Sequence, residues 1–257
     1  MQSDSDVLFN ISGCVATITL NRVARHNALT MQMLEQIEQS VASVERNDEV
    51  RVLKLETASQ RFFCSGADIN EWGDIDAQKM GSQFIREGNR VFRRLAELDK
   101  PTIAVLSASA LGGGLELALA CDLRYASVDA TVGFPEASVG AIPGWMGCAR
   151  LVELVGATRT RELILLGDPI TTSRAAAWGI VNEALPADEL RTRVDAVCET
   201  LLKRSRTSLS VGKRLVRMME TGQPEYAHEF AASVCKASPD AIEGVAAFRE
   251  KRHAKFN

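Results

Sequence analysis

Two glycine-bearing segments of the sequence are suited to bind an anion. Ser-Gly-Ala-Asp occupies residues 65–68, and three glycines at residues 112–114 are followed two positions later by Glu116. Each segment stands between a strand-like run and a helical pattern. Glycine permits unusual turns, and the first turn of a helix presents unbonded N–H groups at the positive end of its dipole. If two such amides converge, they can hold a carbonyl oxygen as it becomes an enolate or a tetrahedral anion. Close packing of a strand against a helix is the alternative reading of the glycines.

Two glutamates accompany these segments. Glu116 lies within an otherwise apolar helical run, and Glu136 follows 20 positions later in the sequence Gly-Phe-Pro-Glu-Ala. Burial of a lone carboxylate is costly, and two carboxyls in one apolar cleft do not both ionise readily. One would stay protonated while the other acts as a base. The structural alternative is that Glu136 caps a turn and Glu116 bonds to a backbone amide.

A third glycine segment, residues 140–144, also ends where a helix is expected to begin. Its amides, Gly144 among them, are suited to orient a water or a thioester oxygen.

The elements that position these residues alternate between strands and helices. The patterns predict a hairpin of residues 7–11 and 14–20, a helix over residues 30–46 with Thr30 as N-cap, and a second helix after residue 76 that Pro101 ends. They also predict a helix over residues 115–120 and strands at residues 51–57, 102–106 and 122–127. This order implies an α/β sheet with crossover helices.

Beyond Gly144 the pattern is mainly helical, and only residues 180–185 have the pattern of a strand. Helices are predicted at residues 148–155, 159–166, 173–178, 188–204, 208–220, 225–237 and 239–251.

Composition excludes several classes of function. The 257 residues have a formal net charge of −3, which gives no general attraction for nucleic acid or an acidic membrane. Six cysteines lack a Cys-x-x-Cys spacing and the three histidines lie apart, so we expect no metal site. With no secretory signal and no long apolar stretch, a cytoplasmic protein that does not span a membrane is expected.

Several motifs, in order, resemble those of the crotonase, or enoyl-CoA hydratase/isomerase, superfamily over essentially the whole chain. The matching stretches are Asn21-Arg22, residues 27–29, 63–69, 110–117, 134–136 and 140–144, and in the tail residues 240–244 and 248–251. The resemblance implies a crotonase-like α/β fold, a spiral of ββα units over residues 1–195, with a C-terminal helical trimerisation region over residues 196–257. It also implies a homotrimer or homohexamer.

The resemblance assigns catalytic roles. Ala67 and Gly113 would supply the two N–H groups that polarise the thioester carbonyl of an acyl-CoA. Glu116 and Glu136 fall on the two glutamate positions that hydratases of this family use, and Gly144 on the position whose amide helps to place the water.

Binding residues follow from the same resemblance. The residues expected along the CoA path are Arg25, His26, Ser65, Gly66, Asp68 and Ile69, with Phe248 and Lys251 reaching the CoA of a neighbouring subunit. Trp145 and Met146 depart from the common hydratase pattern and are assigned to the acyl pocket, although packing of Trp145 in the core is the alternative. No cofactor is implied, because coenzyme A is part of the substrate.

The predicted function is reversible hydration of a trans-2-enoyl-CoA to a 3-hydroxyacyl-CoA. One alternative is a Δ3,Δ2-enoyl-CoA isomerase that relies mainly on Glu136. Another is a non-catalytic family member that binds acyl-CoA or RNA, although the negative charge and the lack of a basic, aromatic-rich strand argue against RNA.

Overall fold

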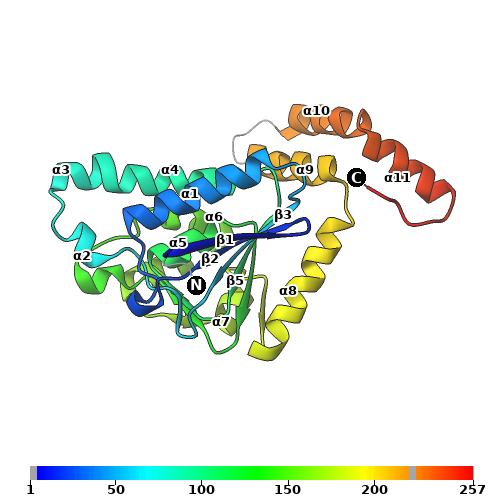
Figure 1. The fold of residues 1–257 in the computed structure, drawn as a ribbon. Coiled ribbons are helices and arrows are strands. Elements are labelled where there is room, and N and C mark those ends of the chain that lie inside the picture. Colours follow the sequence, from blue (N-terminus) through cyan, green and yellow to red (C-terminus); the bar gives the residue numbers. More distant parts are fainter. Residues whose placement is uncertain (1–4, 220–223, 257) are drawn as a thin grey trace.

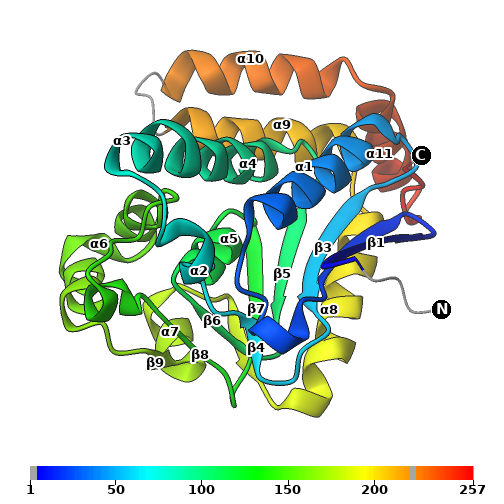
Figure 2. The same cartoon turned by 60° about the vertical axis from the view of Figure 1, so that its left-hand side comes forward.

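Two β-sheets and the helices around them form the framework of the protein (Figures 1 and 2). The computed structural model describes residues 5–219 and 224–256. The larger sheet has the strand order β1-β2-β3-β5-β7-β10, in which β1 and β2 are antiparallel and the other pairs are parallel. Its strands are β1 (Val7–Ser12), β2 (Val15–Leu20), β3 (Val52–Thr57), β5 (Thr102–Leu106), β7 (Leu123–Ser127) and β10 (Glu183–Leu185).

The smaller sheet has the order β4-β6-β8-β9. Strands β4 (Phe62–Cys64), β6 (Ser109–Leu111) and β8 (Thr131–Gly133) run parallel, and β9 (Ile170–Thr171) is antiparallel to β8. The sequence patterns did not reveal these strands, and the prediction of a single strand after Gly144 was wrong because β9 precedes β10. Runs of two or three residues are too short to show the alternation by which a strand is recognised.

The chain repeats a unit of long strand, short strand and helix. β3 and β4 lead to α2 (Ile69–Trp72), α3 (Ala77–Lys79), a π-helix η2 (Met80–Ile85) and α4 (Arg86–Glu97). β5 and β6 lead to α5 (Gly113–Leu119), and β7 and β8 lead to the 3-10 helix η3 (Pro135–Val139) and α6 (Gly147–Leu166). Because the long strands pair in one sheet and the short strands in the other, successive units stack as a spiral. The predicted α/β spiral of ββα units is confirmed.

The remaining helices are η1 (Val23–Arg25), α1 (Met31–Arg46), α7 (Thr172–Trp178), α8 (Ala187–Leu202), α9 (Arg206–Met219), α10 (Pro224–Lys236) and α11 (Pro239–Arg249). Thr30 caps α1 as predicted, since its hydroxyl accepts the Met33 N–H at 3.1 Å. The two helices predicted at 148–155 and 159–166 form α6, with a non-helical Gly156 between them. α8 continues through the boundary predicted between residues 195 and 196, so the chain enters its C-terminal region within a helix.

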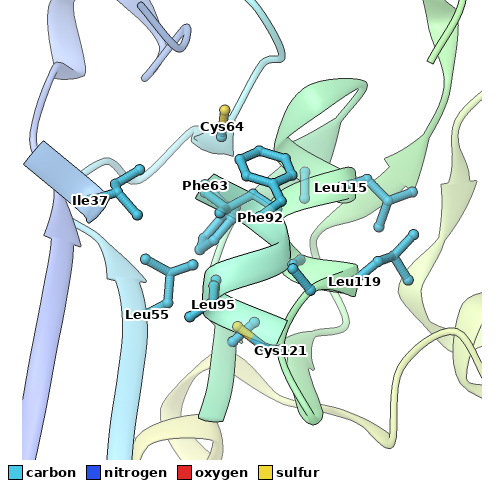
Figure 3. Close-up of a cluster of buried hydrophobic side chains, with 14 of the residues drawn as sticks. Ile37, Leu55, Phe63, Cys64, Phe92, Leu95, Leu115, Leu119 and Cys121 are labelled. Carbon is cyan, nitrogen blue, oxygen red and sulfur yellow. The ribbon is translucent and has the colours of Figure 1, made fainter. Parts of the chain in front are cut away.

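Buried apolar side chains hold α1, α4 and α5 against the sheets. Figure 3 shows Ile37 of α1, Leu55 of β3, Phe63 of β4 and Phe92 of α4 converging on one cluster, and each has at most 1% of its surface exposed. Truncating a buried phenylalanine such as Phe92 to alanine typically costs about 3–5 kcal/mol.

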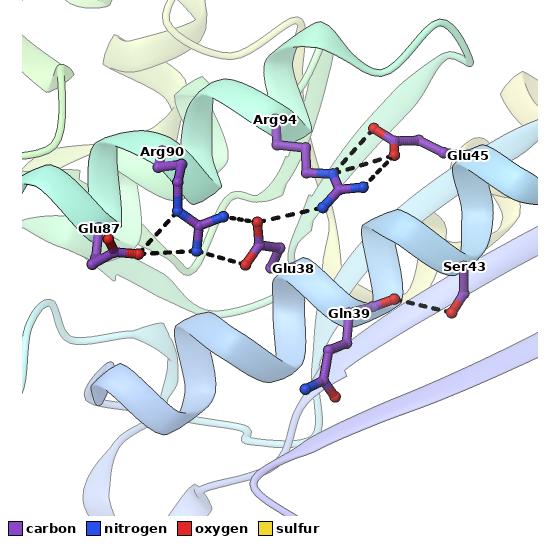
Figure 4. A network of polar contacts seen from close by, with 7 residues as sticks. All are labelled: Glu38, Gln39, Ser43, Glu45, Glu87, Arg90 and Arg94. Atoms are coloured by element: carbon purple, nitrogen blue, oxygen red, sulfur yellow. Dashed lines mark hydrogen bonds and ion pairs between the residues drawn. The ribbon is translucent and has the colours of Figure 1, made fainter.

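Ion pairs on the outer side of α1 and α4 contribute less to stability than the apolar cluster. Arg90 binds Glu38 and Glu87, and Arg94 binds Glu38 and Glu45 (Figure 4). Exposed pairs of this kind contribute about 0.2–1 kcal/mol each. The apolar cluster therefore contributes most to the packing of these helices. Their packing positions one wall of the site described next.

Candidate active site

The three predicted functional segments follow the carboxyl ends of three adjacent parallel strands. Residues 65–68 come after β4, residues 112–114 after β6, and residues 134–136 after β8. β4 pairs with β6 and β6 with β8, so the short strands bring segments from distant parts of the sequence together. Ligands of parallel sheets are commonly bound at this edge.

The backbone N–H groups of Ala67 and Gly113 lie side by side. A Cβ placed on Gly113 would be 3.3 Å from the Ala67 nitrogen, and one on Gly66 would be 3.5 Å from the Gly113 nitrogen. Gly113 begins α5 and therefore has no partner within the helix. Among the described residues, neither N–H donates to a backbone carbonyl. The two N–H groups are thus free to bind one oxygen atom between them.

Glycine is required at the turns that present these amides. Gly66 has a φ of +115° and Gly112 a φ of +50°, and both conformations are strained for other residues. Gly114 instead serves close packing, because a Cβ there would lie 2.4 Å from the Cys64 carbonyl oxygen. The glycines therefore include both turn-forming and packing positions.

Glu116 is buried on the first turn of α5, with 1% of its surface exposed. Its Oε1 accepts hydrogen bonds from the N–H groups of Trp145 and Gly147, each at 2.7 Å. Burial raises the pKa of Glu116 to about 7, although these two hydrogen bonds oppose the rise because they favour the carboxylate. The charge of Glu136 also raises the pKa of Glu116, so the two acids are electrostatically coupled.

Glu136 lies on η3, beside Gly112. A Cβ on Gly112 would be 2.9 Å from its Oε1. Its Oε2 is buried and has no hydrogen-bond partner among the described residues. Burial raises the pKa of Glu136 to about 7. Buried polar atoms normally have a hydrogen-bond partner, so this oxygen is available to a molecule bound in the cavity.

Both glutamates, Ala67 and Gly113 line one cavity of about 480 Å³. Gly144, Ser65 and Gly66 also line it. Its walls are otherwise mainly apolar, and they include Ile69, Trp72, Met80, Phe84, Ile85, Val139, Ile142 and Trp145. A cavity of this size with a few convergent polar groups has the character of a small-molecule site.

Trp145 both fills the core and forms part of the cavity wall. Its ring packs on Phe84 at 5.2 Å and on Phe92 at 5.3 Å between centroids, and only 2% of the residue is exposed. Met146 differs, since it is 44% exposed and is not among the residues that line the cavity. Of the two residues assigned to the acyl pocket, the structure therefore brings only Trp145 to it.

Gly88 of α4 makes room for the indole of Trp145. A Cβ on Gly88 would lie 2.2 Å from the indole Nε1. We expect Gly88→Ala to destabilise the protein by about 1–3 kcal/mol in urea unfolding, as overpacking does. The double variant Gly88→Ala, Trp145→Leu should show less than the sum of the two single effects, because the clash is gone. Gly81→Ala is the control, since a Cβ there has no neighbour within 4 Å, and additive effects would contradict the close contact.

The residues predicted along the CoA path are only partly together. Ser65, Gly66 and Ile69 line the cavity. Arg25 and His26 are exposed at the end of η1, and the His26 ring packs at a tilt against Phe62, with 4.9 Å between centroids. Asp68 is 5% exposed and accepts a hydrogen bond from Arg22 at 2.6 Å, so its carboxylate is occupied within the protein.

Two C-terminal candidates lie away from this group. Phe248, on α11, is 85% exposed, and Lys251 follows that helix. Figures 1 and 2 both show α11 on the other side of the molecule from α2 and α3. Within this chain, Phe248 and Lys251 are therefore separate from the cavity.

Sequence reasoning missed the residues that hold Glu116. Its partners, the N–H groups of Trp145 and Gly147, are 29 and 31 positions away. Arg150 was also missed, and its Nη1 donates to the Trp145 carbonyl at 3.1 Å, which steadies the same turn. The sequence offered a glycine at position 147, and the structure gives its reason, since a Cβ there would lie 2.7 Å from the Glu116 Oε1.

Comparison with known proteins identifies the class to which this fold and site belong. The family model described as "Enoyl-CoA hydratase/isomerase" matches residues 10–257, and the chain belongs to that family. This confirms the crotonase resemblance of the sequence motifs.

Individual relatives agree with this assignment. The chain is 32% identical to the short-chain-enoyl-CoA hydratase of Clostridium acetobutylicum over 96% of both chains. It is 32% identical to the crotonyl-CoA hydratase of Syntrophomonas wolfei over 94% of both chains. The crystal structure of an enoyl-CoA hydratase from Bacillus anthracis superposes with a TM-score of 0.93 at 27% identity, covering 98% of this chain and 99% of that one.

Proposed function

We propose that this protein adds water reversibly to a trans-2-enoyl-CoA and forms a 3-hydroxyacyl-CoA. The observation that carries the proposal is the convergence of two glutamates and two unbonded amides on one apolar cavity. Membership of the enoyl-CoA hydratase/isomerase family and the hydratase names of the relatives support it.

In the proposed reaction, the thioester oxygen accepts hydrogen bonds from Ala67 and Gly113. As negative charge develops on that oxygen, each donor of this kind stabilises the transition state by about 3 kcal/mol. The positive end of the α5 dipole adds to the effect. The α-carbon and β-carbon of the substrate then lie toward the two glutamates, and the acyl chain lies along the apolar wall.

The proton transfers are assigned from the surroundings of each acid. Glu116, whose Oε1 accepts two N–H groups, is favoured as the ionised base that takes a proton from water as the water oxygen bonds to the β-carbon. Glu136, whose buried Oε2 has no partner among the described residues, is favoured as the protonated acid that gives a proton to the α-carbon. Gly144 lines the same cavity, and in this proposal its N–H helps to hold the water. After the addition Glu116 holds the proton taken from water and Glu136 lacks the one it gave, and exchange with solvent restores both, so the net reaction adds one water and needs no further cofactor.

The test is the absorbance of the enoyl thioester. Purified protein should remove the absorbance of crotonyl-CoA, and a series of longer and branched enoyl-CoA substrates would locate the preferred chain. If none is hydrated while calorimetry still shows acyl-CoA binding, the protein is a non-catalytic binder and the proposal is wrong.

Isomerisation of a 3-enoyl-CoA to a 2-enoyl-CoA is the second candidate. The unpartnered Oε2 of Glu136 favours it, because one free carboxyl can carry a proton from C2 to C4. The glutamine variants described in the Discussion separate the two reactions.

The proposal extends to assembly and location. Four large apolar residues on α9–α11 are 70% or more exposed, namely Val216, Phe230, Ile242 and Phe248. Their exposure supports association of this region into a homotrimer or homohexamer. Light scattering should then give the mass of three or six chains.

None of the six cysteines forms a disulfide, which supports a cytoplasmic location. In the part of the chain that the structure describes, no helix is long and apolar enough to cross a membrane.

The raised pKa of Glu136 predicts a dependence of stability on pH. The native carboxyl titrates at about 7 and the unfolded one at 4.5, so between these values the native state binds more protons and stability falls as pH rises. Above pH 7 the loss is complete. We expect Glu136→Gln to stabilise the protein at pH 8 by about 1–2 kcal/mol. A pKa shift of this size in a fully buried group would correspond to roughly 3 kcal/mol, but water reaches part of this carboxyl and reduces the effect. Urea unfolding at pH 5 and pH 8 checks this, and an equal effect at both values would contradict it.

A further inference from the structure

A second pocket, of about 170 Å³, lies at the far end of α1 from the active-site cavity. α1 begins beside α2, where the Met31 N–H donates to Glu71 at 2.8 Å. Its 16 residues carry the chain about 24 Å away from there. The pocket forms where α1 ends and where β3 and α9 begin, and it is separate from the cavity that contains Glu116.

Three cationic side chains line this basic pocket: Arg51, Lys100 and Arg206. Arg51 donates to the Leu202 carbonyl at 2.8 Å, Lys100 to the Asn47 carbonyl at 2.6 Å, and Arg206 to the Asp48 carbonyl at 2.5 Å. These acceptors are neutral. Among the described residues, none of the three cations forms an ion pair with a carboxylate within 4.0 Å. Their hydrogen bonds are partly satisfied, but their charges are not neutralised.

The proximity of these cations has an electrostatic cost. Burial, and after it the charge of Arg206, lowers the pKa of Arg51. Burial also lowers the pKa of Lys100, and there the charge of Arg206 adds to the effect while that of Asp48 opposes it. In addition, the Nε of Arg206 is buried and has no hydrogen-bond partner in the part of the chain that the structure describes. A bound anion would relieve the repulsion and accept this N–H.

The nearby carboxylates do not neutralise the three cations. Asp99 is engaged by Arg214, whose Nε donates to it at 2.7 Å, and Asp240 accepts the Ser205 hydroxyl at 2.5 Å. Asp48 and Asp99 both line the pocket beside the three cations, and Asp48 is exposed to solvent. The pocket therefore retains an excess of positive charge.

Two further features favour an oxyanion. Arg206 is the first residue of α9, a helix of 14 residues whose positive dipole end faces this region. Ser210, one turn further along, adds a hydroxyl to the lining. We propose that the basic pocket formed by Arg51, Lys100, Arg206 and Ser210 binds a phosphate-class oxyanion, independently of the acyl-CoA site.

Calorimetric titration of the full-length protein with inorganic phosphate tests this proposal. Ionic strength is held constant with sodium chloride, so that general screening does not contribute. We expect saturable binding of phosphate and a thermal midpoint that rises with phosphate but not with chloride. Arg206→Gln should weaken binding at least tenfold, and Arg206→Lys, which retains the charge but lacks Nε, should weaken it less.

Arg191→Gln is the matched control, because Arg191 is a 94% exposed arginine elsewhere on the surface. It should bind phosphate like the wild type, and Arg206→Gln should keep the wild-type kinetics with crotonyl-CoA. Glucose 6-phosphate, titrated in parallel, distinguishes the source of the group: tighter binding than free phosphate indicates a phosphate ester, and weaker binding indicates the free ion. Equal responses to phosphate and chloride, or unchanged affinity in Arg206→Gln, would overturn the proposal.

Discussion

Glu116→Gln should lower kcat for hydration of crotonyl-CoA by about 10³-fold, within the range usual for loss of a general base. Glutamine keeps the shape of the side chain and can still accept the Trp145 and Gly147 N–H groups through its oxygen. It cannot take a proton from water. The loss should therefore appear in kcat, with little change in KM.

Glu136→Gln should reduce hydration to a similar degree, since it removes the acid that gives a proton to the α-carbon. The two variants differ in isomerisation of a 3-enoyl-CoA, which should survive Glu116→Gln better than Glu136→Gln. Glu199→Gln is the control, because Glu199 is 72% exposed on α8. Retention of wild-type hydration in Glu116→Gln would contradict its role as the base, and equal retention of isomerisation in both variants would contradict the distinction.

For the wild-type enzyme, the pH profile of kcat/KM should be bell-shaped. The proposed reaction needs one ionised and one protonated carboxyl, and burial raises the pKa of both acids to about 7. Hydration should then fall on both sides of neutral pH, with apparent pKa values that belong to the coupled pair. A rate that is flat from pH 5 to pH 9 would contradict this arrangement.

Gly113→Ala should lower kcat/KM by about 10²–10³-fold, because crowding would weaken the oxyanion contacts about as much as losing one donor does. The new Cβ would lie 3.3 Å from the Ala67 nitrogen and 2.7 Å from the Cζ3 of Trp145. It would crowd the position where the thioester oxygen binds and push on the indole. Steady-state kinetics with crotonyl-CoA measures the loss.

The double variant Gly113→Ala, Trp145→Leu separates these two effects. Replacing the indole relieves the clash with Trp145 and should restore part of the stability, but it does not clear the space beside Ala67. Activity should therefore remain low. Gly212→Ala is the control, because a Cβ at that helical position has no neighbour within 4 Å. Recovery of full activity in the double variant would show that the loss came from displacement of the indole alone.

Local sequence features predicted the elements well where they were long. Thr30 and the apolar spacing after it define α1, and the alternation in residues 14–20 defines β2, because these signals come from residues close together in the chain. The short strands β4, β6, β8 and β9 carry too few residues for such a signal. They form because the neighbouring strands supply hydrogen bonds.

By itself, the sequence determined the kinds of groups in the site: glycines that free the amides of Ala67 and Gly113, and the acids Glu116 and Glu136 in apolar surroundings. Tertiary structure alone decided their relations. It bound Glu116 to amides about 30 positions away and placed Trp145 but not Met146 on the cavity wall. Within residues 5–219 and 224–256, it also left one oxygen of Glu136 without a partner. The physical reason is that pKa values and free hydrogen-bonding groups depend on burial and on through-space contacts, and neither depends on separation along the chain.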